Sequence, residues 1–254
     1  MAAGAFDVGA FLSMGDAENE RRQGKATMES DFKQHPTRLA PDDFWGQVKR
    51  TVNGKPVTQE QIDLIVSAIR NALALDSEQS LLDLACGNGA LSSYFFEECG
   101  QFLGVDFSEP LIEIARRYFE RPGRHFRLAD IVAYVTTEPA PEAFTRALCY
   151  GSFAYLPESG ARTLLRTLHD RFTKVDRIFI GNLPDLDRHG AFYTDGLDHS
   201  AELQDPESRI GIWRSAETFC ALGRDCGWEV EIRHMPANFY ATHYRYDALL
   251  WRLG

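Results

Sequence analysis

Short hydrophobic runs alternate with longer amphipathic stretches along most of the chain. The clearest amphipathic stretch starts at Thr58, where Gln61 three residues later completes the pattern of a capping box. Apolar side chains then recur at spacings of three and four residues, which places them on one face of a helix. They are Ile62, Ile65, Ile69 and Leu73. This pattern predicts a helix that packs one side against a core.

The segments that follow alternate between strand and helix. Buried runs predict strands at residues 80–85, 102–105, 125–128, 146–150 and 177–181, and amphipathic stretches predict helices at 90–99, 109–119, 158–172 and 215–226. Such alternation is typical of a parallel sheet with helices on both faces. Two last strands, 228–234 and 243–251, are joined through residues 235–238, too short for a crossover helix, and are expected to pair antiparallel. The predicted fold is α/β: a doubly wound, mostly parallel, seven-stranded Rossmann-like sheet with a C-terminal antiparallel hairpin and an N-terminal helical segment.

The chain is expected to form one folded domain. Residues 1–30 mix small and charged side chains with little periodicity, which is typical of a flexible tail. Residues 31–254 are predicted to form the domain, with lid elements at 43–57 and 182–213. The second lid is long for a plain connection, and such loops commonly cover binding sites.

The charge balance narrows the classes of partner. With 27 basic and 37 acidic side chains the formal net charge is −10, which disfavours nucleic acid and anionic membrane surfaces as partners. No apolar run approaches the ~20 residues of a membrane span, and the first residues lack the basic start of a signal peptide. A cytoplasmic protein is therefore expected. Five cysteines without a C-x-x-C pair predict reduced thiols rather than disulfides or a zinc site.

Candidate chemistry gathers where the predicted strands end. Gly87 and Gly89 follow the first strand of the alternating pattern and permit a tight turn with a close backbone approach to a ligand. Asp106 ends the next strand, where an acid accepts from ribose hydroxyls. Asp130 follows the third, where a carboxylate can accept from an adenine amine. Together these positions predict a nucleoside-cofactor site at one edge of the sheet.

Asp83 favours one cofactor over another. It lies four residues before Gly87 and would repel the pyrophosphate of a dinucleotide. In addition, dinucleotide-binding motifs usually have a third glycine or an alanine at the position that Ser92 occupies here. S-adenosylmethionine has no phosphate and carries a sulfonium and an ammonium group, which a carboxylate attracts. The residues therefore favour S-adenosylmethionine.

The motifs Asp83-x-Ala-Cys-Gly-x-Gly89, Gly104-Val-Asp106-Phe-Ser and Ala129-Asp130-Ile resemble those of class I S-adenosylmethionine-dependent methyltransferases. More loosely, the chain is similar to bacterial small-molecule methyltransferases of polysaccharide or secondary-metabolite pathways. Asn182 departs from the pattern, because an acid is expected there. The resemblance implies a cofactor site made of Gln47, Thr51, Asp83, Ala85, Cys86, Gly87, Gly89, Asp106, Phe107, Asp130, Ile131 and Cys149.

The acceptor is expected to be a small polar molecule. The strand ending at Tyr150 lacks the Asn/Asp-Pro-Pro-Tyr motif of enzymes that methylate nucleic-acid bases, and Tyr150, Phe153 and Tyr155 are candidates for the lining of a compact pocket. Tyr193 in the 182–213 loop is a further candidate for substrate binding. Aromatic packing without a ligand explains Tyr150 and Tyr155 equally well. For a hydroxyl acceptor, His199 or His189 in the 182–213 loop is the candidate general base, against the alternatives of a solvated acidic loop and a minor divalent-metal site.

The last predicted strand offers an anion site. Alternation puts His243, Arg245 and Asp247 on one face, where His243 and Arg245 could hold a carboxylate or phosphate of the substrate. A solvated strand face is the alternative.

The sequence therefore predicts a methyltransferase that acts on a small polar molecule, with oxygen favoured over nitrogen. Three alternatives stay open: an N-methyltransferase, a nicotinamide-dependent oxidoreductase, and a non-catalytic protein that binds S-adenosylmethionine.

Overall fold

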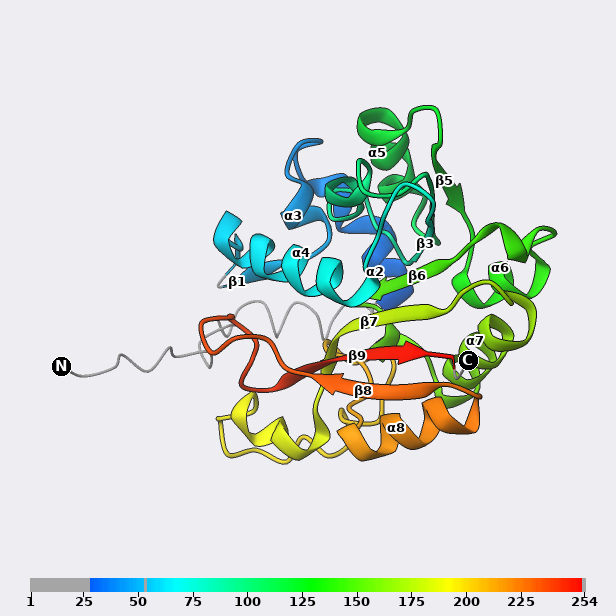
Figure 1. The fold of residues 1–254 in the computed structure, drawn as a ribbon. Coiled ribbons are helices and arrows are strands. Elements are labelled where there is room, and N and C mark those ends of the chain that lie inside the picture. The colour runs from blue at the N-terminus through cyan, green and yellow to red at the C-terminus, as the bar shows by residue number, and fades with distance from the viewer. Residues whose placement is uncertain (1–27, 53, 253–254) are drawn as a thin grey trace.

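The computed structural model describes residues 28–52 and 54–252, and its centre is one seven-stranded sheet (Figure 1). The strand order is β5-β4-β3-β6-β7-β9-β8, in which β3 to β7 run parallel and β9 pairs antiparallel with both β7 and β8. The predicted fold class is therefore confirmed. The strands are β3 Ser80–Leu84, β4 Gln101–Asp106, β5 Arg124–Leu128, β6 Arg146–Tyr150, β7 Arg177–Pro184, β8 Glu229–Arg233 and β9 Arg245–Trp251.

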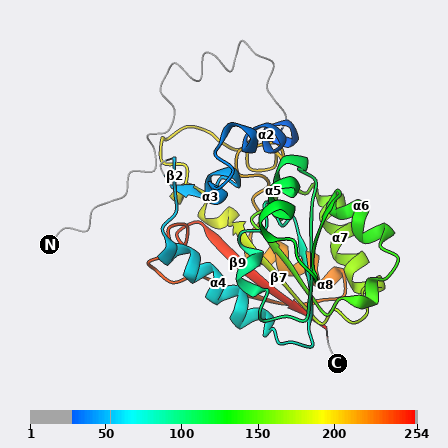
Figure 2. The same cartoon turned by 90° about the horizontal axis from the view of Figure 1, so that it is seen from above.

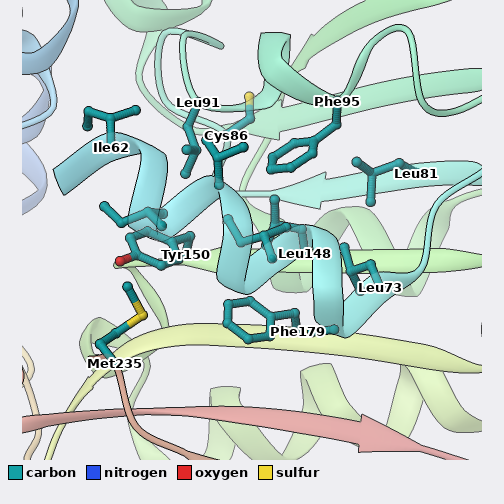
Figure 3. Packing of buried hydrophobic residues seen from close by; sticks show 14 of the residues in the cluster. Ile62, Leu73, Leu81, Cys86, Leu91, Phe95, Leu148, Tyr150, Phe179 and Met235 are labelled. Carbon is teal, nitrogen blue, oxygen red and sulfur yellow. The ribbon is translucent and has the colours of Figure 1, made fainter. Parts of the chain in front are cut away.

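Helices cover both faces of the sheet because each hides an apolar stripe against it. On one face α4 and α5 pack with the 3-10 helix η2, and on the other α6, α7 and α8 pack against the same strands (Figure 2). Figure 3 shows the first cluster from close by, with Leu73 and Leu81 at one end and Tyr150 and Met235 at the other. The helices are α4 Gln59–Leu73, η2 Ser92–Phe95, α5 Glu109–Phe119, α6 Ile131–Thr137, α7 Glu158–Arg171 and α8 Ala216–Asp225, with the short 3-10 turns η3 Pro141–Ala143 and η4 Phe153–Tyr155.

Three local predictions were wrong. Residues 90–99 form only the short 3-10 helix η2, and the chain forms a helix over Ile131–Thr137 that the pattern did not indicate. The capping box is absent as well: Thr58 precedes α4 without a side-chain cap. The Gln61 side chain instead bonds the backbone of Asn238 and Tyr240, far along the chain, because tertiary partners are available to it.

A segment N-terminal to α4 crosses the carboxyl ends of the strands. It consists of α2 Met28–Gln34, the 3-10 turn η1 Pro36–Arg38, α3 Phe44–Gln47 and a small hairpin of β1 Thr51–Val52 and β2 Lys55–Pro56 (Figure 2). Asp43 caps α3 by accepting from the N–H of Gly46. The predicted tail at 1–30 falls almost entirely outside the described residues. The lid predicted at 43–57 corresponds to α3 and the hairpin.

The described helices include none that is long and apolar enough to cross a membrane. All five cysteines are free thiols, and four of them are buried.

Close packing under the sheet edge provides a test of the core. A methyl group on Gly104 of β4 would come within 2.7 Å of the Cys86 sulfur and 2.9 Å of the Phe126 ring, whereas one on Gly190 would meet nothing within 4 Å. We expect Gly104→Ala to lower the free energy of unfolding by about 1–3 kcal/mol through overpacking. Urea unfolding monitored by circular dichroism measures this change. Gly190→Ala is the matched control, and equal midpoints for the two variants would contradict the packing described here.

Candidate functional site

A tight turn follows β3 where the strand order reverses, between β4 and β6. The N–H groups of Ala85 and Cys86 both donate to the Val105 carbonyl, at 2.7 and 3.0 Å. Ala85, Gly87 and Gly89 have φ angles of +69°, +58° and +78°, a region that favours glycine and strains alanine. The turn is thus fastened to the end of β4, at the position where open α/β sheets bind ligands.

Asp106 at the end of β4 holds this turn in place through a hydrogen bond. Its carboxylate accepts from the N–H of Gly87 and from the N–H of Ser108, both at 2.9 Å. The side chain is only 5% exposed, and burial raises the pKa of Asp106 to about 6, although the two amide donors oppose the shift. Both oxygens retain lone pairs, so the carboxylate can also accept from hydroxyl groups of a ligand.

Asp83 lies within β3 and is 3% exposed. The hydroxyl of Ser92 donates to its carboxylate. Burial raises the pKa of Asp83 to about 7, and the nearby negative charge of Asp106 adds to the shift, whereas Ser92 and the cation of Arg50 oppose it. Two buried acids that repel each other are a site for a cation, because a positive ligand would stabilise both ionised forms.

Asp130 has a structural partner as well as its predicted role. It is exposed and caps α6 by accepting from the N–H of Ala133 at 2.8 Å. Ile131, the first residue of that helix, is buried. The capping bond accounts for the aspartate without a ligand, so its contact with adenine stays a prediction.

The N-terminal segment reaches the glycine turn through Gln47. This buried side chain donates to the Ala40 carbonyl and accepts from the Asn88 amide in the turn, at 2.8 and 2.9 Å. Val48 lies directly above the turn, since a methyl group on Gly87 would come within 2.9 Å of it. Asn88 was not among the predicted site residues, and only its place between the two glycines could have indicated it.

The remaining residues predicted for the cofactor lie on either side of this contact. Thr51 is half-buried in the hairpin, where it pairs with Pro56. Phe107 follows Asp106 and packs edge-on against Phe32 of α2, with ring centroids 6.5 Å apart. Cys149 is buried in β6, beside Ile180 of β7.

Tyr150 and Tyr155 extend the site beyond the end of β6. Tyr150 is 5% exposed, and its hydroxyl has no hydrogen-bond partner among the described residues. Tyr155 packs against Phe32 at 5.5 Å between ring centroids and donates to the Arg209 carbonyl at 3.0 Å. Tyr155 thereby joins α2 to the long loop that follows β7.

His189, Tyr193 and His199 meet in that loop around a recess of about 160 Å³. His189, in the 3-10 helix η5 Leu186–Ala191, is exposed, and its Nδ1 lies 2.8 Å from the Leu186 carbonyl. His199 stacks on Tyr193 with centroids 4.0 Å apart. Its two ring nitrogens contact Glu202 and Asp195, and these hydrogen bonds raise the pKa of His199.

The predicted pairing of His243 with Arg245 on one strand face is wrong. β9 begins at Arg245, and His243 is exposed in the preceding turn, so strand alternation does not extend to it. Arg245 is half-buried, lies over the Tyr244 ring at 4.9 Å and donates to the Asn182 carbonyl. Asp247 is buried and accepts from the N–H of Asn182 at 2.7 Å.

Asn182 stands where an acid was expected because β7 is irregular there. The register with β9 shifts between Ile180 and Leu183, and Asn182 has φ +66°. Asparagine tolerates this left-handed conformation better than most residues. Within residues 28–52 and 54–252, no group of three or more histidines, cysteines or acids is arranged to hold a metal.

The side chains at the glycine turn fit S-adenosylmethionine. Asp83 and Asp106 are both buried acceptors, which suit an ammonium, a sulfonium and ribose hydroxyls and do not suit a phosphate. The turn itself is a glycine cradle with two positive φ angles. The geometry therefore supports the cofactor that the sequence favours.

Comparisons with known proteins agree with this geometry. Residues 81–174 match the family described as Methyltransferase domain. The ubiquinone biosynthesis O-methyltransferase of Stutzerimonas stutzeri is 22% identical over 67% of this chain and 73% of its own length, and the other curated relatives that match are covered over 27–39% of theirs.

Solved structures of methyltransferases share the fold, and two of them illustrate the likeness. A SAM-dependent methyltransferase from Anabaena variabilis has a TM-score of 0.58 at 18% identity and covers 89% of this chain and 95% of its own. The magnesium protoporphyrin IX methyltransferase of Synechocystis, solved with SAH, has a TM-score of 0.51 at 16% identity and covers 77% of this chain and 83% of its own.

The buried charge of Asp83 predicts opposite effects on stability and on binding. With its pKa raised to about 7, Asp83 contributes stability that is fully present below the unfolded value of about 4 and is lost as the pH rises to 7. We expect Asp83→Asn to be more stable than the wild type at pH 8 without ligand, with a difference that shrinks towards pH 4. The same variant should bind S-adenosylmethionine more weakly.

Urea unfolding between pH 4 and 8 and titration calorimetry measure the two effects. Asp76→Asn, which removes the same charge from an exposed position, is the control. An Asp83→Asn variant that is destabilised at pH 8 and binds normally would refute this account.

Proposed function

We propose that the chain is a class I S-adenosylmethionine-dependent methyltransferase that transfers a methyl group to a small polar molecule, and that a hydroxyl oxygen receives it. The methyltransferase-domain match over residues 81–174 and the likeness to an O-methyltransferase and to methyltransferase structures support this proposal. When bound, the cofactor supplies the methyl group on a sulfonium that leaves as a neutral thioether. Asp83 and Asp106 would hold the charged and hydroxyl groups of the cofactor. The glycine turn would allow the cofactor to approach the main chain closely. The nicotinamide alternative gains no support from the family match.

The contacts that surround the end of β6 are the observation that supports a small molecule as the acceptor. Phe32 of α2 packs against both Phe107 and Tyr155, and the Ser108 hydroxyl donates to the Phe32 carbonyl. From the other side, the Tyr155 hydroxyl donates to the Arg209 carbonyl. A macromolecular acceptor would have to displace these contacts, which favours a small molecule as the acceptor.

Exclusion of water and alignment of the two reactants provide much of the rate acceleration in methyl transfer. The ring contacts of Phe32 with Phe107 and Tyr155 would limit the access of water to the region beside Asp106. The curated relative of 22% identity is named as an O-methyltransferase, which supports oxygen as the acceptor atom. Methylation of nitrogen is the second possibility.

Of the two candidate bases, the geometry favours His189. With Nδ1–H donating to the Leu186 carbonyl, the Nε2 lone pair of His189 is available to take a proton. In His199 both ring nitrogens contact carboxylates, and the raised pKa favours the charged form, which cannot act as a base. We therefore propose His189 as the general base and a structural role for His199.

Transfer of labelled methyl groups tests the proposed function directly. We expect methyl-labelled S-adenosylmethionine and the purified protein to label a component of a small-metabolite filtrate, and mass spectrometry of the product identifies oxygen or nitrogen as the acceptor atom. Protein and nucleic-acid fractions of the same extract serve as controls. Label that enters only those fractions would refute a small-molecule acceptor.

The choice between the two histidines has its own test. Once the acceptor is identified, His189→Gln is expected to lower kcat about 10²–10⁴-fold, because general-base catalysis contributes that much, and to leave S-adenosylhomocysteine binding unchanged. His199→Gln should change kcat only a few-fold. Single-turnover kinetics measure both, and the reverse order of effects would assign the base to His199.

A further inference from the structure

Two arginines near the carboxyl ends of β6 and β7 form no ion pair in the part of the chain that the structure describes, although the charge of Arg245 acts on the buried Asp247. No described carboxylate oxygen lies within 4.0 Å of either guanidinium. Arg245 donates to the Asn182 carbonyl and hydrogen-bonds to the Tyr244 side chain. Arg50 stacks over the rings of Trp45 and Tyr150, at 5.5 and 5.0 Å. Since a guanidinium has five N–H donors, most of their hydrogen-bonding capacity is unused.

The two arginines lie in one neighbourhood. Burial raises the pKa of Tyr150 and of Tyr240, and in both cases the positive charges of Arg50 and Arg245 oppose the shift. A methyl group on Gly151, the residue after β6, would lie 3.9 Å from Arg50 and 3.6 Å from the side chain of Asn182. Arg245 donates to that same asparagine. Both cations therefore face the space around the end of β6.

Two polar atoms in this space are buried without partners. The Tyr150 hydroxyl, on a side chain that is 5% exposed, and the Oδ1 atom of Asn182 make no hydrogen bond within the described residues. A buried hydroxyl without a partner costs stability unless a ligand satisfies it. In the cluster of Figure 3, Tyr150 lies at the end beside Met235 and Ile62, away from Leu73 and Leu81.

We propose that the acceptor carries an anionic group, a carboxylate or a phosphate, which binds to Arg245 and Arg50 and accepts a hydrogen bond from the Tyr150 hydroxyl. An oxyanion satisfies all three groups at once, because guanidinium forks and a phenol are donors that match its oxygens. The aromatic rings of Tyr150, Tyr155 and Tyr244 line the same space and suit a compact acid with an aromatic ring. This inference rests on the proposed function and specifies its substrate class.

The proposed anion site lies away from the Asp83 and Asp106 carboxylates, so the two sites would attract groups of opposite charge. The two carboxylates lie at the end of β3 and β4, whereas Arg245 begins β9, on the far side of β6 and β7 in the strand order. The acids attract the cationic part of the cofactor, and the arginines attract a group of opposite charge on the partner that it meets. The carboxylate of the cofactor itself is the other source of such an anion, and Arg50, whose charge acts on Asp83, is the arginine closer to that end.

Binding of small acids to the protein saturated with S-adenosylhomocysteine tests the proposal. The probes are 4-hydroxybenzoate and phenyl phosphate, with the neutral 4-hydroxybenzamide as the comparison. We expect at least one acid to bind more tightly than the amide and Arg245→Gln to weaken that acid about ten- to hundred-fold, the effect of losing charge-assisted hydrogen bonds. Tyr150→Phe, which keeps charge and nearly the volume, should weaken it several-fold. Titration calorimetry measures each affinity.

Arg121→Gln is the control for net charge, because Arg121 pairs with Glu97 near β5 at the opposite edge of the sheet. It should leave the affinity for the acids unchanged. If neither acid binds better than the amide, or if both the Arg245→Gln and Tyr150→Phe variants bind the acid as the wild type does, the proposal is wrong. If Arg245→Gln weakens S-adenosylhomocysteine as much as the acid, the anion belongs to the cofactor and the acceptor assignment falls. Labelling of a neutral small molecule in the transfer assay would then still support the proposed function.

Discussion

The carboxylate of Asp106 is the interaction on which the cofactor site depends. By accepting from Gly87 and Ser108 it joins the turn after β3 to the residues that start α5. This bond keeps the glycine amides in the conformation that their positive φ angles require. It also buries a charge beside a second acid, Asp83, so without a ligand the site loses stability as the pH rises through 6 to 7. A cation in the cleft relieves that repulsion, which couples binding to stability.

On the side of the site proposed for the acceptor, the groups without partners are positively charged or are hydrogen-bond donors. Arg50 and Arg245 form no ion pair among residues 28–52 and 54–252, and the Tyr150 hydroxyl is buried without a hydrogen bond. Such unsatisfied groups are common at functional sites, because a bound ligand provides the hydrogen-bond or ion-pair partner that the protein lacks. Two acids therefore lie on β3 and β4, whereas two arginines lie beside β6 and β9, where the buried Asp247 offsets part of their charge.

Three segments, α2, α3 and the loop after β7, cover the carboxyl ends of the strands. Phe32 of α2 contacts Phe107 on one side and Tyr155 on the other, and Gln47 of α3 reaches the turn through Asn88. The loop after β7 completes the cover through Arg209 and Ile212, whose N–H donates to the Ala154 carbonyl. Each contact joins segments that are far apart in the chain.

The strands of the sheet can be read from the sequence, because central parallel strands are continuous apolar runs and the helices between them have apolar positions with a period of 3.6 residues. The sequence also located Gly87, Asp83 and Asp106, since parallel strands bring their ends to one edge. Four features followed only from the folded structure. Residues 90–99 form little helix, Gln61 bonds Asn238 and Tyr240, His243 lies outside β9, and Arg50 stacks on Tyr150. Those outcomes depend on contacts across long stretches of chain, where competition between partners, and not local pattern, sets the conformation.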